Sequence, residues 1–283
     1  MPLTPLTVEW RHVVLATAVA VSAAVTFAQP PLAQWPEYHQ MADVRRVLGI
    51  PNALNVLSNI PFAIVGVIGL AQVFHRKRDS QITFHDRWER WPYAAFFAGI
   101  TLTCIGSAYY HLAPDNARLV WDRLPMTIAF MGLLAALITE RIGIRFGRRL
   151  LVPLLVTGVS SVAYWYWTEA RGSGDLRFYV LVQFGSLALV LLLLVLYRPK
   201  YPGSAYLFGG LVLYAVAKVF EIADASIYEA GRIVSGHTLK HLAAATGAAG
   251  VVMALSRRKA HEPSDVFEDS RGERRRAMAG AGR

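Results

Sequence analysis

An apolar run of 20 residues at 178–197, FYVLVQFGSLALVLLLLVLY, contains no charged side chain. A helix of about 20 mostly apolar residues is long enough to cross the hydrocarbon core of a bilayer. Similar runs recur along the chain, and together they predict an all-α, polytopic membrane bundle. The expected spans lie at about residues 11–28, 52–74, 92–111, 121–140, 150–167, 178–197, 205–223 and 237–255.

The composition argues against a soluble protein and against a nucleic-acid-binding protein. Of the 283 residues, 54% are hydrophobic and only 17% are charged, whereas about 25% of the residues in a soluble domain are charged. The net charge of +10 comes largely from short loops and the C-terminal tail, and no basic face is interleaved with aromatic residues. The single cysteine, Cys104, lies inside an apolar run, which excludes a disulfide framework and a thiolate metal site.

The chain divides into three parts by composition. Residues 1–30 predict an N-terminal transmembrane helix, which could act as a signal anchor but lacks a clean A-x-A cleavage site. Residues 31–256 hold the remaining spans and form the predicted membrane domain. Residues 257–283 are polar and basic, and we expect a disordered cytoplasmic tail there.

The distribution of basic residues predicts how the protein sits in the membrane. Lysine and arginine are concentrated after the second, fourth and sixth spans and in the tail, in the stretches HRKRD, RIGIRFGRR, RPK and SRRK. Loops rich in lysine and arginine stay in the cytoplasm. We therefore expect an integral, multi-pass membrane protein with both termini cytoplasmic.

Polar side chains occur at the opposite, non-cytoplasmic ends of three predicted spans. His111 ends the third span, Asp122 begins the fourth, and His237 and His241 open the eighth, four residues apart on one helical face. Ser107 precedes His111 by one helical turn. Ionisable groups at membrane depth are energetically costly and usually mark a functional site. We expect these five side chains to converge near the non-cytoplasmic face.

The chemistry of this group favours a catalytic metal. Three neutral imidazoles with one open position are a ligand set for catalytic zinc, which lowers the pKa of a bound water to near neutrality. Asp122 would then act as general base and later as proton donor, and Ser107 would hydrogen-bond the oxyanion or the substrate carbonyl. Imidazole also suits iron and other divalent ions, so the residues alone leave the metal open.

Each of these residues also has a structural interpretation. A single H-x-x-x-H pair is more often two interfacial histidines than a ligand pair, and Ser107 can hydrogen-bond a carbonyl of its own helix. Asp122 and Arg123 can form an ion pair that caps the fourth span. Lys218, Glu221 and Asp224 share one helical face, where an ion pair between helices is favoured over support of the histidines.

Four motifs make the chain resemble the alkaline ceramidase family, as a bacterial-type member. The motifs lie within residues 36–256, in the family's order and spacing: LNVLSNIPF, GSAYYH, WDRLPM and GHTLKH. The family belongs to a superfamily of seven-helix membrane hydrolases that includes the progestin and adiponectin receptors. The resemblance implies a seven-helix core, here with one extra N-terminal transmembrane helix.

The resemblance also implies an activity and the residues that carry it. Zinc would be held by His111, His237 and His241, and Asp122 and Ser107 would act on the metal-bound water and the substrate amide. The implied reaction is hydrolysis of the amide bond of a ceramide-like membrane lipid to a sphingoid base and a fatty acid. The expected partners are therefore this lipid and the bilayer, without nucleic acid.

Two features near the first core helix bear on further ligands. Eukaryotic family members bind calcium just before this helix, and here the stretch is PEYHQMADVRRVLGIPN. Asp43, Asn52 and Glu37 could supply oxygens, but the acidic pattern of the family is not reproduced, so the resemblance gives calcium little support. Asn55, Ser58 and Asn59 match the family, and we expect them to hydrogen-bond between helices or, for the two asparagines, to support the site.

Three other functions are compatible with the sequence. The protein could hydrolyse another lipid amide or ester, or it could be a receptor-like protein with a structural zinc. In a transporter, Lys218, Glu221 and Asp224 would form an ion relay, but the inverted repeats typical of transporters are not evident. The sequence does not predict an oligomeric state.

Overall fold

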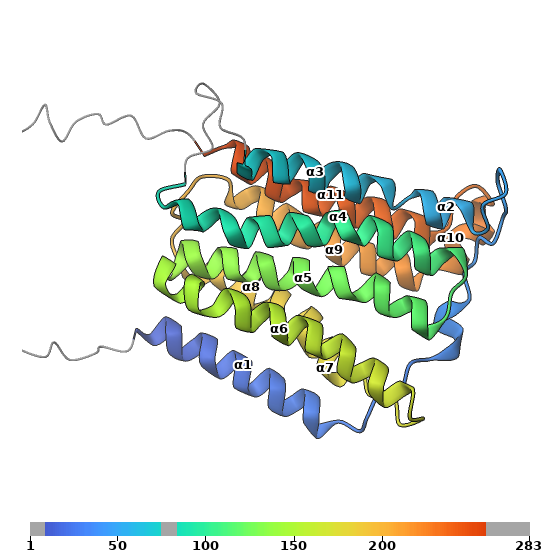
Figure 1. The fold of residues 1–283 in the computed structure, drawn as a ribbon, viewed down its shortest axis with the longest axis horizontal. Helices are drawn as coiled ribbons and strands as arrows, with labels where there is room; N and C mark the ends of the chain where they lie inside the picture. The colour runs from blue at the N-terminus through green and yellow to red at the C-terminus, as the bar shows by residue number, and fades with distance from the viewer. Residues whose placement is uncertain (1–8, 75–83, 259–283) are drawn as a thin grey trace, which may run out of the picture.

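The computed structural model describes residues 9–74 and 84–258, and these residues form a bundle of helices without a β-strand (Figure 1). The predicted tail, residues 257–283, lies almost entirely outside the described residues. The helices are α1 (Trp10–Ala28), α2 (Ala53–Leu57), α3 (Ile60–Phe74), α4 (Arg90–Leu112), α5 (Asn116–Arg141), α6 (Ile144–Glu169), α7 (Arg177–Val180), α8 (Ser186–Leu196), α9 (Ser204–Ile222), α10 (Asp224–Gly231) and α11 (Gly236–Ser256). Short turns are η1 (Pro36–His39), η2 (Arg87–Glu89) and the π-helical η3 (Leu181–Gly185).

The chain is a multi-pass membrane protein. Seven helical segments of the described residues are long and apolar enough to cross a bilayer: α1, α2–α3, α5, α6, α7–α8, α9 and α11. The prediction of an all-α polytopic bundle is confirmed. The remaining expected span, 92–111, is also a helix: α4 has 23 residues and lies beside α3 and α5 within the bundle, although it is less apolar than the other seven.

The helices around the centre of the bundle are packed more closely than the first helix. α4 packs against α5 and α3, α5 packs against α6, and α11 packs against α9 and α3 (Figure 1). By contrast, α1 lies at the edge of the bundle along α7, η3 and α8, and none of its residues is buried. The extra N-terminal helix is therefore peripheral, whereas the predicted site residues are carried by the central helices.

The structure shifts two helix starts and adds one helix that the sequence analysis did not predict. α5 begins at Asn116 because the Asp115 carboxylate caps it, accepting a hydrogen bond from the Arg118 backbone N–H at 2.7 Å. Asp122 thus lies in the second turn of the helix instead of at its beginning. α6 begins at Ile144, directly after Gly143. The short helix α10 separates α9 from α11.

Two motif glycines allow the helices that carry the polar residues to approach closely. A Cβ atom at Gly106 on α4 would lie 1.9 Å from the Trp121 carbonyl oxygen on α5. A Cβ atom at Gly236, the first residue of α11, would lie 2.2 Å from the Phe220 carbonyl oxygen on α9. Backbones this close leave no room for any other residue, and they bring the polar ends of α4, α5, α9 and α11 together.

Candidate metal centre

Three histidine side chains meet at one end of the bundle. His111 comes from the last turn of α4, and His237 and His241 come from the first two turns of α11. One ring nitrogen from each residue lies within 4.8 Å of the others, and the ring centroids are 4.7–4.9 Å apart. All three side chains are buried. The i, i+4 spacing places His237 and His241 on one face of α11, and the packing of α3 against both α4 and α11 brings His111 beside them.

The spacing of the ring nitrogens fits a shared metal ion. His111 Nε2 and His237 Nε2 are 3.3 Å apart, and two ligands in a tetrahedral zinc site at about 2.0–2.1 Å from the ion are about 3.3–3.4 Å apart. Among the residues that the structure describes, this is the only group of three or more His, Cys, Asp or Glu side chains placed to hold one ion. The three histidines could therefore hold a metal.

Hydrogen bonds from neighbouring segments hold the ring of His241 and the backbone of His237. Ser58 Oγ lies 2.7 Å from His241 Nδ1, which leaves Nε2 of that ring for a metal. The Asp224 carboxylate accepts a hydrogen bond from the His237 backbone N–H at 2.7 Å and one from the Ala42 backbone N–H at 3.0 Å. The sequence analysis noted Ser58 but did not assign it to the site. The signal was a hydroxyl between two asparagines at the start of a predicted span.

Asp122 and Ser107 lie beside the histidines in a cavity of about 170 Å³. Both side chains are buried, and both line the same cavity. His241 lines the same cavity. The alternative interpretation of Asp122 and Arg123 as an ion pair is not supported, because Arg123 Nη2 instead donates to Gln34 Oε1 at 2.6 Å. This arrangement leaves the Asp122 carboxylate facing the cavity beside His241.

Lys218, Glu221 and Asp224, which were expected on one helical face, lie on two helices. Glu221 forms ion pairs with Lys218 on its own helix and with Lys240 on α11, the latter at 2.9 Å. This is the expected ion pair between helices, and Lys240 is the partner that the sequence analysis did not identify. Asp224 does not share it, because the helix breaks at Ala223 and Asp224 starts α10. Glu221 and both lysines also line the cavity.

The side chains of Asn55, in α2, and Asn59, just after it, hydrogen-bond to backbone and hydroxyl groups and so hold segments together. Asn55 Oδ1 accepts hydrogen bonds from Ser235 Oγ at 3.3 Å and Thr238 Oγ1 at 2.9 Å, so it stabilises the start of α11. Asn59 Nδ2 donates to the Asn55 carbonyl at 2.8 Å. Asn55 therefore supports His237 and His241 through the backbone of their helix.

The residues considered for calcium do not fit a cation site. The Asp43 carboxylate is occupied by the Arg45 guanidinium, with N–H···O distances of 2.8 and 2.7 Å. These hydrogen bonds lower the pKa of Asp43. Asn52 Nδ2 donates to the His111 carbonyl at 2.8 Å, and Glu37 is exposed. Arg45 therefore takes the position beside Asp43 that a cation would need.

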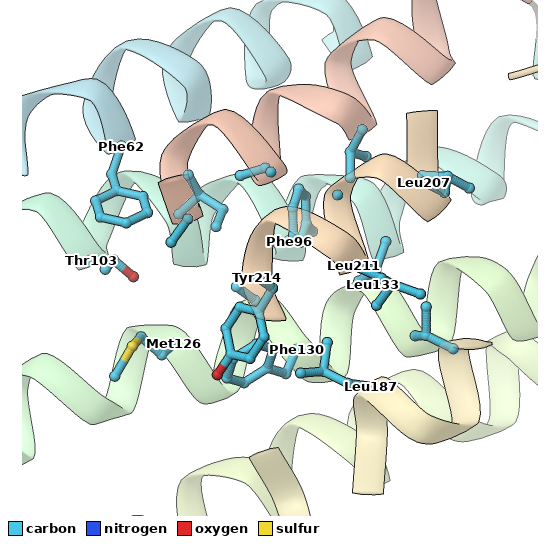
Figure 2. A pocket seen from close by; sticks show the side chains of 18 of the residues that line it. Phe62, Phe96, Thr103, Met126, Phe130, Leu133, Leu187, Leu207, Leu211 and Tyr214 are labelled. Carbon is cyan, nitrogen blue, oxygen red and sulfur yellow. The ribbon is translucent and has the colours of Figure 1, made fainter. Parts of the chain in front are cut away.

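A second, apolar cavity of about 110 Å³ adjoins the polar one (Figure 2). The two cavities share Phe62, Thr103, Met126, Tyr214 and Ala244 as lining residues. Phe96, Phe130, Leu133, Leu187, Leu207 and Leu211 extend the apolar cavity along the bundle. A polar cavity that His241 lines thus adjoins a hydrophobic one, and such a pair can accommodate the polar and apolar parts of one lipid.

Comparison with known proteins identifies one family. The family model described as Ceramidase matches residues 49–262, about three-quarters of the chain. The match begins just before α2 and therefore includes every helix that contributes to the two cavities, but not α1. Searches of curated proteins and of solved structures gave no match.

Proposed function

Because the chain belongs to the ceramidase family, we propose that it is a zinc-dependent membrane amidase that hydrolyses ceramide-like lipids to a sphingoid base and a fatty acid. One observation carries this proposal: a member of the histidine cluster, His241, lines a cavity together with Asp122 and Ser107, and this cavity adjoins an apolar one. The family itself implies a hydrolase of amide bonds with a lipid substrate in the membrane.

We propose that His111, His237 and His241 hold the zinc ion, each as a neutral imidazole. When bound there, zinc supplies a Lewis acid for the amide carbonyl and lowers the pKa of the attacking water. Ser58 keeps the His241 ring in the required orientation through Nδ1. Asp224 holds the start of α11 through the His237 backbone N–H, so the two ligands on α11 keep their position relative to His111.

Asp122 is the proposed proton carrier. Its carboxylate lies in the cavity beside His241, where it can accept a proton from the attacking water. The oxygen of that water forms the new bond to the amide carbon. As the carbon–nitrogen bond breaks, Asp122 returns the proton to the leaving nitrogen, so that the products are a carboxylic acid and an amine. Ser107, which lines the same cavity, donates a hydrogen bond to the substrate carbonyl oxygen.

The two cavities accommodate the rest of the substrate. The acyl chain occupies the apolar cavity between α4, α5, α9 and α11, and the amide lies where the two cavities meet. The site lies at the end of the bundle where α4 ends and α11 begins (Figure 1). With both termini in the cytoplasm, as the basic loops predict, this end faces the non-cytoplasmic side.

The test combines metal content with fatty acid release from ceramide, for the detergent-purified wild type and for His237→Ala. We expect about one zinc per chain and ceramide hydrolysis in the wild type, with both lost in the variant. His85→Ala, which changes an exposed histidine outside the cluster, is the control and should retain both. Zinc without hydrolysis of any lipid amide would contradict the enzymatic proposal and indicate a receptor-like role. Absence of any metal from folded protein would contradict the metal centre.

A further inference from the structure

Among the charged residues that line the polar cavity, Arg123 has neither a role in the proposed reaction nor an ion-pair partner within residues 9–74 and 84–258. Its side chain is 5% exposed and lines the cavity beside Asp122. Nη2 donates to Gln34 Oε1, whereas Nη1 is buried without a hydrogen-bond partner in the described part of the chain. Arg258 also has buried N–H groups without a partner, but the Glu140 carboxylate neutralises its charge. Arg123 has no ion-pair partner among the described residues, and a buried cation without a counter-charge indicates a ligand.

Aromatic rings hold this guanidinium in place. Its Cζ atom lies 4.2 Å from the ring centroid of Trp165, 4.7 Å from that of Tyr179 and 5.6 Å from that of Tyr38. Stacking on aromatic rings stabilises a buried guanidinium through the two flat faces of the group. The N–H groups at its edge remain for hydrogen bonding, and one of the two terminal nitrogens has no partner.

The charged side chains that line the cavity carry an excess of positive charge, which also favours an anionic ligand. Three cationic side chains line it, Arg123, Lys218 and Lys240, but only two carboxylates do, Asp122 and Glu221. Glu221 already pairs with both lysines. In the proposed reaction Asp122 must remain free to carry a proton, so no carboxylate of the cavity is available to neutralise Arg123. The shortfall is one negative charge.

We propose that Arg123 binds a carboxylate group of the lipid in the cavity. The carboxylate has two possible sources with the same chemistry: the acidic head of an N-acyl amino acid, or the fatty acid that hydrolysis releases. Arg123 lines only the polar cavity, whereas the apolar cavity adjoins it through Phe62, Thr103 and Met126. A lipid with its chain in the apolar cavity can therefore present a carboxylate to Nη1. The proposal rests on the proposed function only in taking a lipid amide or its product as the ligand.

Two matched substrates distinguish the sources of the carboxylate. N-palmitoylglycine and N-palmitoylethanolamine have the same chain and the same amide, but only the first has an acidic head. If Arg123 binds the head, the wild type should have a kcat/KM at least about tenfold higher for N-palmitoylglycine. Arg123→Gln should abolish this preference by raising KM. If Arg123 binds the product, both substrates should be hydrolysed equally, and palmitate should inhibit Arg123→Gln at least about tenfold less than the wild type.

Equilibrium binding tests the proposal without any hydrolysis. Labelled palmitate and labelled hexadecanol differ only in the carboxylate, and the wild type should bind palmitate more tightly. Asp122→Asn should keep this preference, so a failure of the proposed reaction would not be mistaken for a failure of the carboxylate site. Arg118→Gln, which removes a more exposed arginine from the same helix, should change neither substrate preference nor binding.

Two results would overturn the proposal. One is a wild type that shows no preference for palmitate over hexadecanol and none for N-palmitoylglycine over N-palmitoylethanolamine, a result that needs no variant. The other is a folded Arg123→Gln protein with unchanged substrate preference and unchanged palmitate binding. If Arg123→Gln does not fold, Arg123→Lys is used, which keeps the charge but not the planar donor group. Its affinity for palmitate should lie between the affinities of the wild type for palmitate and for hexadecanol.

Discussion

Two buried clusters of polar side chains lie toward opposite ends of the bundle, and they differ in how completely their charges are paired. Asp122 and Glu140 are both on α5, 18 residues or about 27 Å apart along the helix. We call the cluster around Asp122 the histidine end (Ser107, His111, Asp122, Arg123, His237 and His241). The cluster around Glu140 is the arginine end (Glu89, Tyr93, Glu140, Lys200, Tyr201 and Arg258).

At the arginine end, each carboxylate forms an ion pair with a cation of the chain, although Arg258 Nε and Nη1 have no hydrogen-bond partner among the described residues. Glu140 forms an ion pair with Arg258 and accepts a hydrogen bond from Tyr93 Oη at 2.5 Å. Glu89 accepts hydrogen bonds from Lys200 Nζ and from Tyr201 Oη, both at 2.6 Å. These contacts join η2, α4 and α5 to the segments after α8 and α11. The arginine end therefore holds helix ends together.

At the histidine end, several groups lack a partner from the chain. His111 Nε2 and His237 Nε2 face each other. Asp122 and Arg123 form no ion pair with each other, and Arg123 Nη2 donates instead to the uncharged side chain of Gln34. A buried cluster that serves stability satisfies its charges internally, because an unpaired buried charge is costly. Unpaired groups gathered in a cavity instead indicate that a metal and a substrate complete the cluster.

The strongest test of this difference replaces one carboxylate at the histidine end. Asp122→Asn removes the proposed proton carrier without changing its size, and we expect kcat for ceramide hydrolysis to fall by about 10²–10⁴-fold. Metal content and the Tm should stay near the wild-type values. Asp115→Asn is the control, because asparagine also caps helices well. An Asp122→Asn variant with more than a tenth of wild-type kcat would contradict the assigned role.

The corresponding change at the arginine end should affect stability and leave chemistry intact. Glu140→Gln leaves the buried Arg258 without its ion-pair partner, and we expect the free energy of unfolding to fall by about 3–5 kcal/mol. Unfolding in detergent measures the change, with metal content per folded chain unchanged. Arg148→Gln, which breaks the exposed ion pair with Asp86, is the control and should change the free energy of unfolding by less than about 1 kcal/mol. Equal effects of the two variants would mean that the arginine end does not stabilise the bundle.

The close approach of α4 and α5 can be tested with a single methyl group. Gly106→Ala would place a Cβ atom against the Trp121 carbonyl, which should separate the helices that carry Ser107 and Asp122. We expect a loss of about 1–3 kcal/mol in the free energy of unfolding, together with lower activity. Gly209→Ala is the matched control, since a Cβ atom there meets nothing within 4 Å. The control should be neutral or slightly stabilising, and a harmless Gly106→Ala would refute the packing argument.

The smallest expected effect concerns the orientation of one ligand. Ser58→Ala removes the hydrogen bond to His241 Nδ1, and we expect metal affinity to fall by about 10–100-fold, measured by competition with a chelator. Ser161→Ala removes another buried hydroxyl, one that bonds only within its own helix, and should leave metal affinity unchanged. An unaltered affinity in Ser58→Ala would show that the ring is held by packing alone.

The positions of the helices were predictable because hydropathy is a local property of the sequence. All eight expected spans are helices. Asp122 was recognised from the sequence because a carboxylate is unusual at membrane depth. The start of α5 was placed five residues too late because Asp115 acts as its cap. α10 was not predicted because a short, polar helix has no distinct hydropathy signal. The ion pair from Glu221 to Lys240 joins residues from two helices, which spacing within one helix cannot reveal.

The sequence by itself therefore determined the membrane bundle, the family motifs and the list of polar residues that are costly at membrane depth. Only the tertiary structure decided which of them meet. Ser58 hydrogen-bonds to His241, and the Arg45 guanidinium forms an ion pair with Asp43. Arg123 contacts Gln34 and three aromatic rings instead of Asp122. The physical reason is that each pairing depends on the rotation and separation of two helices or loops, and these are set by close contacts such as that at Gly106.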